Sequence, residues 1–229
     1  MEKMIESILL CTAVTVISYL IGLKVFKRYQ KPWLNPLYTV TVFIISMISL
    51  FHLNMKDYTS GSGVFSLLLG TATVSLAVPL YKHIKLIKKY FLVILWAVLS
   101  GTITGVATVV FLTKLLHVNR EIMITLIPKS VTAPIALSIS QSVGASSSLT
   151  LMFVLFSGIL SLTIGPSMLK YARIKSGIAK GLALGTSAQA IGAKRAFEWG
   201  ELEGAMGSIA MITAAIIMSV FAPLILYIY

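Results

Sequence analysis

The chain has 229 residues, of which 57% are hydrophobic and 11% are charged. A soluble domain carries about 25% charged residues, so this composition excludes a protein that faces water on all sides. The formal net charge of +12 would indicate nucleic-acid binding in a soluble chain, but in a chain this apolar it is expected to mark loops at a membrane surface.

Long apolar stretches are the predicted elements. A helix needs roughly 20 apolar residues to cross a hydrocarbon core of about 30 Å. Stretches suited to this cover residues 5–23, 36–55, 58–81, 90–113, 130–169 and 204–229. The stretch 130–169 has room for about two crossings. The first stretch follows a start that is not net positive and precedes no small-residue cleavage pattern, so we expect a retained helix rather than a signal peptide.

Twelve of the 19 Lys and Arg residues lie in three short clusters. Basic loops between spans mark the cytoplasmic side, where they also meet anionic lipids. The clusters are Lys24, Lys27, Arg28 and Lys31; Lys82, Lys85, Lys88 and Lys89; and Lys170, Arg173, Lys175 and Lys180. The predicted protein is therefore an all-α, multi-pass protein of a bacterial inner membrane, with membrane lipids and no nucleic acid among its partners.

Three apolar stretches separate the second and third basic clusters, and three crossings would place those clusters on opposite sides. One stretch is therefore expected not to cross as a plain helix. Residues 122–143 are the best candidate, because Pro128 and Pro134 remove helix donors there. Freed backbone groups at membrane depth require protein or a water-filled cavity around them. The alternative is that one basic cluster lies outside.

A second interruption is predicted in residues 178–199, where Gly185 and Gly192 flank a run of small and polar residues. Glycine lets the backbone approach a ligand closely. The alternative is that these glycines allow close packing between helices.

An internal repeat is predicted at an offset of 115 residues. Leu67-Leu68-Leu69-Gly70-Thr71 resembles Leu182-Ala183-Leu184-Gly185-Thr186, and the apolar stretches superpose at the same offset while the loop charges alternate. Alternating charge at matched positions is typical of inverted-topology repeats in secondary transporters. The chain is therefore predicted to be one transmembrane domain, 1–229, with inverted halves 1–115 and 116–229 whose broken helices meet near the midplane.

Two polar motifs carry the predicted binding chemistry. In the first, Lys129 is an isolated charge, and Ser130 and Thr132 add hydroxyl donors near a predicted helix start that favours anions. In the second, Thr186, Ser187 and Gln189 cluster between the glycines. The alternatives are a lysine that reaches up to the interface and polar contacts that only join helices.

An enzyme is not predicted. His52, His83 and His117 are scattered, and the single cysteine, Cys11, excludes an intramolecular disulfide. No Cys/His cluster has metal-ligand spacing, and no nucleophile with a base and an orienting acid stands out. We therefore expect no catalytic residues, no metal and no cofactor.

Three segments together resemble a known family: LGTATVSLAVPLYK at 69–82, PKSVTAPIALSIS at 128–140, and SMLKYARIKSGIAKGLALGTSAQAIGAKRAFEWGELEGAMGSIAM at 167–211. They are similar to the LrgB/CidB membrane family, and the resemblance covers nearly the whole chain. Departures occur at Thr71, where the family often has Pro, and at Ala188-Gln189, where it often has Ser-His. The second departure puts proton coupling in doubt.

The resemblance implies two functions. One is a holin- or antiholin-like role with a small LrgA/CidA-like membrane partner, affecting murein hydrolases and autolysis. The other is transport of short hydroxy- or keto-acids, since plastid relatives move glycolate and glycerate and bacterial relatives are linked to pyruvate.

The main prediction from the residues is a transporter of small monocarboxylates of the glycolate, glycerate, lactate or pyruvate type, with the holin-like regulator as the alternative. Lys129, Ser130 and Thr132 are predicted to bind the substrate carboxylate. Thr186, Ser187 and Gln189 are predicted to contact its hydroxyl or keto group, and Arg195 to attract anions at the mouth. Homo-oligomers are compatible with this scheme.

Overall fold

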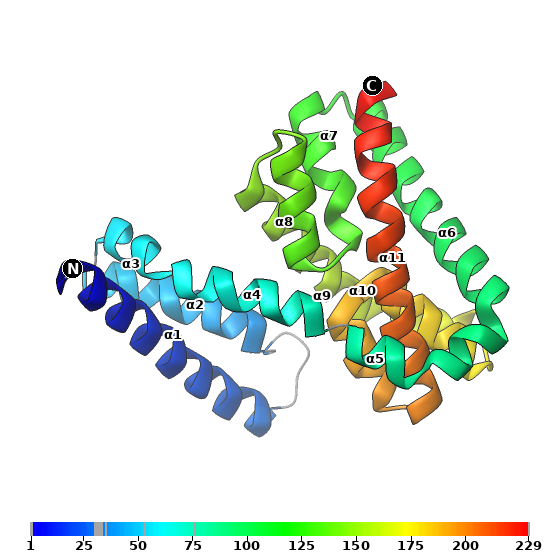
Figure 1. Ribbon diagram of the computed structural model, residues 1–229, viewed down its shortest axis with the longest axis horizontal. Coiled ribbons are helices and arrows are strands. Elements are labelled where there is room, and N and C mark those ends of the chain that lie inside the picture. Colours follow the sequence, from blue (N-terminus) through cyan, green and yellow to red (C-terminus); the bar gives the residue numbers. More distant parts are fainter. Residues whose placement is uncertain (1, 30–33, 35, 53, 76, 229) are drawn as a thin grey trace. The chain divides into compact units, whose positions relative to one another are not determined.

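The computed structural model describes residues 2–29, 34, 36–52, 54–75 and 77–228. Over these residues the secondary structure is helical and contains no strand, which confirms the predicted all-α class. The chain divides into two compact units, Met1–Val74 and Ser75–Tyr229. Figure 1 shows the helices of each unit.

The first unit is built on α1 (Glu2–Tyr29), which packs against α2 (Pro36–Leu50) and α3 (Met55–Gly61) and is followed in sequence by α4 (Gly63–Ser75). The Thr15 and Tyr58 hydroxyl oxygens are 3.0 Å apart and share a hydrogen bond between α1 and α3. The two helices approach closely at Gly61, where an added Cβ would collide with the carbonyl oxygen of Ser7. A small residue at this contact therefore permits the pairing.

The second unit holds the remaining helices. They are α5 (Ala77–Lys82), α6 (Ile84–Leu115), α7 (Arg120–Leu126), the short 3₁₀ helix η2 (Ile127–Ser130), α8 (Ala133–Ser142), α9 (Ser147–Tyr171), α10 (Gly177–Phe197) and α11 (Glu201–Ile228). α11 packs against α6, α8 and α10, and α9 packs against α8, α10 and η2. Figure 1 shows α11 running between α6 on one side and α7 and α8 on the other.

Burial along the long helices confirms that α11 is the centre of the second unit. In α11, 67% of the most apolar window is buried, against 28% or less in the other spans. Small residues make this possible, because an added Cβ on Gly185 of α10 would collide with the backbone of Gly207 on α11. The alternative role predicted for glycine, close helix packing, therefore applies to Gly185.

Four helices are long and apolar enough to cross a membrane, which supports the multi-pass prediction. They cover Met4–Tyr29, Ile84–Leu115, Ser147–Tyr171 and Glu201–Leu224. The stretches 36–55 and 58–81, expected as plain spans, are shorter helices in the structure. α2 ends at Leu50 before His52, whose φ is 47°, and a helix boundary at Ser62, between α3 and α4, interrupts 58–81. The expectation of two plain spans is therefore wrong here.

The interruption predicted in residues 122–143 is present. The α-helical hydrogen bonding of α7 tightens into η2 at Pro128, which lies at one of the first two positions of that helix. Val131 and Thr132 are extended, and Pro134 stands in the first turn of α8, where its missing N–H costs nothing. Prolines thus shape both ends of the break, as their chemistry predicts.

The interruption predicted in residues 178–199 is a single residue inside α10. Gln189 has φ 56° and ψ −135°, whereas Gly185 and Gly192 remain helical. The inverted halves 1–115 and 116–229 remain a prediction.

Candidate binding pocket

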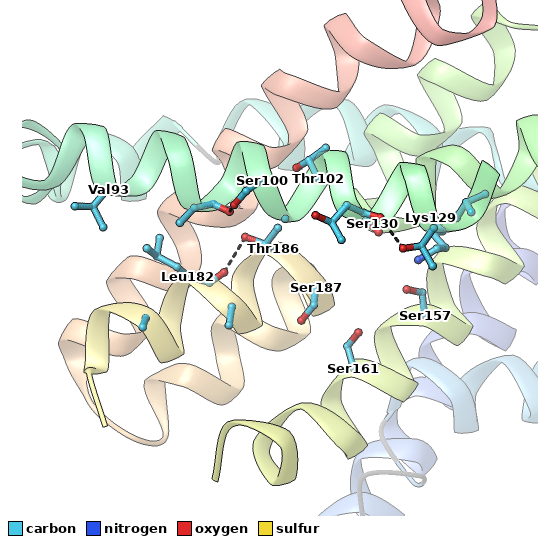
Figure 2. A pocket seen from close by; sticks show the side chains of 18 of the residues that line it. Val93, Ser100, Thr102, Lys129, Ser130, Ser157, Ser161, Leu182, Thr186 and Ser187 are labelled. Atoms are coloured by element: carbon cyan, nitrogen blue, oxygen red, sulfur yellow. Dashed lines mark hydrogen bonds between the residues drawn. The ribbon is translucent and has the colours of Figure 1, made fainter. Parts of the chain in front are cut away.

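A pocket of about 950 Å³ lies within the second unit, between α6, α9, α10 and η2. Its lining includes an unusual number of hydroxyl side chains, so we name it the hydroxyl pocket. Figure 2 shows several of them around the cavity. The serine and threonine residues of the lining are Ser100, Thr102, Thr104, Thr108, Ser130, Ser157, Ser161, Ser176, Thr186 and Ser187. The pocket therefore offers hydrogen bonds between apolar walls, as small-molecule sites commonly do.

Among the described residues that line the hydroxyl pocket, Lys129 is the one that carries a charge. It lies in η2 and is half-buried. No carboxylate lines the cavity, and none forms an ion pair with Lys129 in the described chain. The electrostatic potential inside is therefore set by one cation, which favours an anionic guest.

The hydroxyls differ in what they can donate. Thr108 donates to Thr104 O at 2.7 Å, and Thr186 donates to Leu182 O at 2.8 Å. Their protons are committed to the helix, so these groups offer lone pairs to the cavity.

A second group of hydroxyls keeps its protons available. Within the described chain, Ser157, Ser161 and Ser187 make no side-chain hydrogen bond. Ser161 of α9 and Ser187 of α10 point toward each other across the cavity in Figure 2. With Lys129 they form a set of donors suited to carboxylate oxygens.

Gln189 joins the two interruptions directly. Its Nε2 donates to the Ser130 carbonyl oxygen, and also to Thr186 O at 3.1 Å. The first bond fastens the break in α10 to the end of η2, 59 positions earlier in the chain. A positive φ at a non-glycine residue costs on the order of 1–3 kcal/mol and persists only where surrounding contacts hold it. The two hydrogen bonds of its amide group and the burial of its side chain keep Gln189 in this conformation.

The predicted site residues divide into two groups. Lys129, Ser130, Thr186 and Ser187 line the hydroxyl pocket, whereas Thr132, Gln189 and Arg195 are not among the lining residues. Thr132 is buried, and its hydroxyl has no hydrogen-bond partner among the described residues. Gln189 does not line the pocket, but its side chain donates to the carbonyl oxygen of Ser130, which does. The Arg195 guanidinium donates to Glu198 in an ion pair.

The predicted break residues also lie outside the lining. Pro128 is buried in η2, Pro134 lies in the first turn of α8, and Gly185 contacts α11. An added Cβ on Gly192 would collide with the carbonyl oxygen of Leu184 in the same helix, across the turn at Gln189. These residues therefore shape the backbone around the cavity.

The chain is similar to known proteins over most or all of its length. The model of the LrgB-like family matches residues 15–228. The chain belongs to the LrgB-like family. It is 35% identical to the antiholin-like protein LrgB of Bacillus mycoides over 92% of each chain. It is 30% identical to the holin-like protein CidB of Staphylococcus epidermidis over the full length of both. The uncharacterized protein YxaC of Bacillus subtilis is 35% identical over 94% of each. No solved structure matches.

Several hydroxyl residues that line the pocket of this LrgB-like protein are not among the residues predicted from the sequence. Ser100, Thr104 and Thr108 recur every four residues along α6 and line the hydroxyl pocket. Ser157 and Ser161 repeat the spacing on α9. Residues four apart share one face of a helix, so this periodicity inside apolar spans was a usable signal.

Replacing Gln189 with leucine is expected to lower the melting temperature in detergent by about 6 °C. The change leaves the Ser130 and Thr186 carbonyls without this donor, which costs about 2 kcal/mol, and each kcal/mol is worth about 2–4 °C in a chain of this size. Gln141→Leu is the control, because Gln141 is exposed on α8. Equal melting temperatures for the two variants would contradict a joining role for Gln189.

Proposed function

We propose that this LrgB-like protein is a holin- or antiholin-like membrane protein that regulates murein hydrolase activity and autolysis, and that it is not an enzyme. The observation that carries the proposal is the match over the full length of holin-like CidB, together with the match to antiholin-like LrgB. The names of these relatives favour the regulator over the carboxylate transporter, which is the main prediction from the sequence. A role in a bacterial cell membrane, with an LrgA/CidA-like partner, belongs to the same proposal.

Deletion of the gene in its host tests the regulatory role. We expect the deletion to change the rate of detergent-induced lysis and the murein hydrolase activity of cell extracts. Expression of the wild-type chain should restore both. Lysis curves that coincide for deletion and parent, with and without an LrgA/CidA-like protein, would remove the regulatory function.

A second candidate function is passage of a small organic monocarboxylate through the hydroxyl pocket. The observation that favours it comes from the described lining, which combines one half-buried cation with hydroxyls that have no hydrogen-bond partner and contains no carboxylate. A carboxylate would accept hydrogen bonds from Lys129 and the free serines. The threonines that donate to their own helix would accept from the hydroxyl of a substrate such as glycolate, glycerate or lactate, whereas the keto group of pyruvate would need a donor such as Ser187.

Purified protein in liposomes separates the two candidates. Saturable uptake of labelled glycolate, lactate or pyruvate by the chain alone supports transport. Uptake that requires an added LrgA/CidA-like protein supports an obligatory complex. Absence of uptake in both preparations, with altered lysis in the deletion strain, leaves the regulator as the function.

A further inference from the structure

A second pocket, of about 500 Å³, lies where α9 ends and α10 begins. Four basic side chains line it, and it shares no lining residue with the hydroxyl pocket. They are Lys170, Arg173, Lys175 and Lys180. We name it the basic pocket.

The turn after α9 brings these cations together. The Ile174 N–H donates to Leu169 O, and the Arg173 N–H donates to Lys170 O, both at 3.0 Å. This is the Schellman pattern of helix ends, in which the left-handed position is usually glycine. Here Arg173 occupies that position with φ 54°. Leu169 and Ile174 pack together beneath it, as is common in this motif.

The charges of the basic pocket are not neutralised within the described chain. The ion pair among the described residues joins Arg195 to Glu198, and neither of these residues lines the basic pocket. No acidic residue is among the described residues of its lining. The Glu203 carboxylate packs against Gly177 and Gly200 instead. Lys180 lies 5.9 Å from the centre of the Trp199 ring, a cation–π contact that leaves its charge in place. The pocket therefore concentrates positive charge without an internal partner.

The other walls of the basic pocket are apolar and lie at the end of a span. Pro166 and Leu169 belong to the last turns of α9, whose span ends at Tyr171. Met168 and Tyr171 beside them are 64% and 92% exposed. Trp199 adds an aromatic ring with a polar N–H, a residue type typical of the membrane–water interface. A ligand that fits these walls has an anionic group and an apolar part.

We infer that the basic pocket binds the phosphate of an anionic phospholipid head group. Phosphate accepts charge-assisted hydrogen bonds from arginine and lysine, and basic pockets at the ends of membrane helices suit such head groups. Free inorganic phosphate shares this chemistry, but it has no apolar part to contact Pro166 and Leu169. The site is separate from both proposed functions.

Native mass spectrometry of the purified protein with phosphatidylglycerol, phosphatidylcholine or inorganic phosphate tests the inference. We expect phosphatidylglycerol to bind at least about tenfold more tightly than phosphatidylcholine. The combined variant Lys170→Gln, Arg173→Gln and Lys175→Gln should bind phosphatidylglycerol on the order of 100-fold more weakly, since each cation near the surface contributes about fivefold.

The matched control is Lys82→Gln, Lys85→Gln and Lys88→Gln. It removes the same charge from exposed lysines that line neither pocket. This variant should keep the affinity for phosphatidylglycerol. An equal loss in both variants would overturn the site, because the attraction would then be general. Inorganic phosphate that competes fully with the lipid at equal concentration would overturn the lipid assignment.

Tryptophan fluorescence gives a second measurement, which tests lipid binding even if the triple variant fails to fold. Trp33→Phe and Trp96→Phe leave Trp199 as the one tryptophan. In vesicles of equal bromolipid content, brominated phosphatidylglycerol should quench Trp199 more strongly than brominated phosphatidylcholine. Equal quenching by the two lipids would overturn the inference.

Discussion

Lys129→Met is expected to weaken the binding of glycolate, lactate or pyruvate by about 100-fold while the protein still inserts and folds. Removing one partner of a desolvated charge pair costs about 3 kcal/mol, which is roughly 100-fold in affinity. Methionine keeps the length and the apolar stem, so the wall around η2 is preserved. Calorimetric titration of the detergent-solubilised protein gives the affinity, and uptake into liposomes gives the flux.

The control for Lys129 is Lys194→Met. Lys194 is an exposed lysine on α10 that does not line the hydroxyl pocket. It should leave carboxylate affinity unchanged. If the two variants bind the acids equally well, Lys129 is not part of the site. If the wild-type protein binds none of these acids, carboxylate transport is excluded, and the regulatory function is not affected by that result.

Gly185→Leu is expected to lower the melting temperature by about 10 °C or to prevent folding. A side chain at this position collides with the backbone of Gly207, and backbone cannot move aside as a flexible side chain can. Overpacking of this kind costs about 3 kcal/mol or more, and about 2–4 °C is lost per kcal/mol. Thermal unfolding in detergent, followed by circular dichroism, measures the change.

Gly105→Ala is the matched control, because an added Cβ there meets nothing within 4 Å. Alanine is favoured over glycine inside a helix by about 0.5–1 kcal/mol, so the melting temperature should stay the same or rise slightly. A similar fall in both variants would show that loss of glycine itself, and not the α10–α11 contact, causes the effect.

The membrane class and the broken segment at 122–143 could be predicted because both follow from local chemistry. Charge-free stretches of sufficient length specify spans, and Pro128 and Pro134 specify where helical hydrogen bonding fails. The same local argument failed for residues 58–81. Gly61 ends α3 and Gly63 begins α4 there, and the apolar character of a stretch does not register a helix end.

The exact break in α10 could not be predicted from local propensity. Glycine is the residue expected at a positive φ, yet Gln189 adopts it while Gly185 and Gly192 remain helical. The reason is tertiary: the Gln189 amide reaches the Ser130 carbonyl, a partner far away in the sequence. The clustered polar motif did place Thr186 and Ser187 beside the cavity with Lys129 and Ser130.

The bond between Gln189 and Ser130 has a consequence for biogenesis. Ser130 precedes Gln189 by 59 residues, so the carbonyl leaves the ribosome well before its partner has been synthesised. In the interval, the end of η2 lacks this donor, and a backbone group in lipid needs a substitute such as water or an insertion factor. The cavity walls therefore close only after α10 has entered the bilayer, which makes this joint a late event in co-translational assembly.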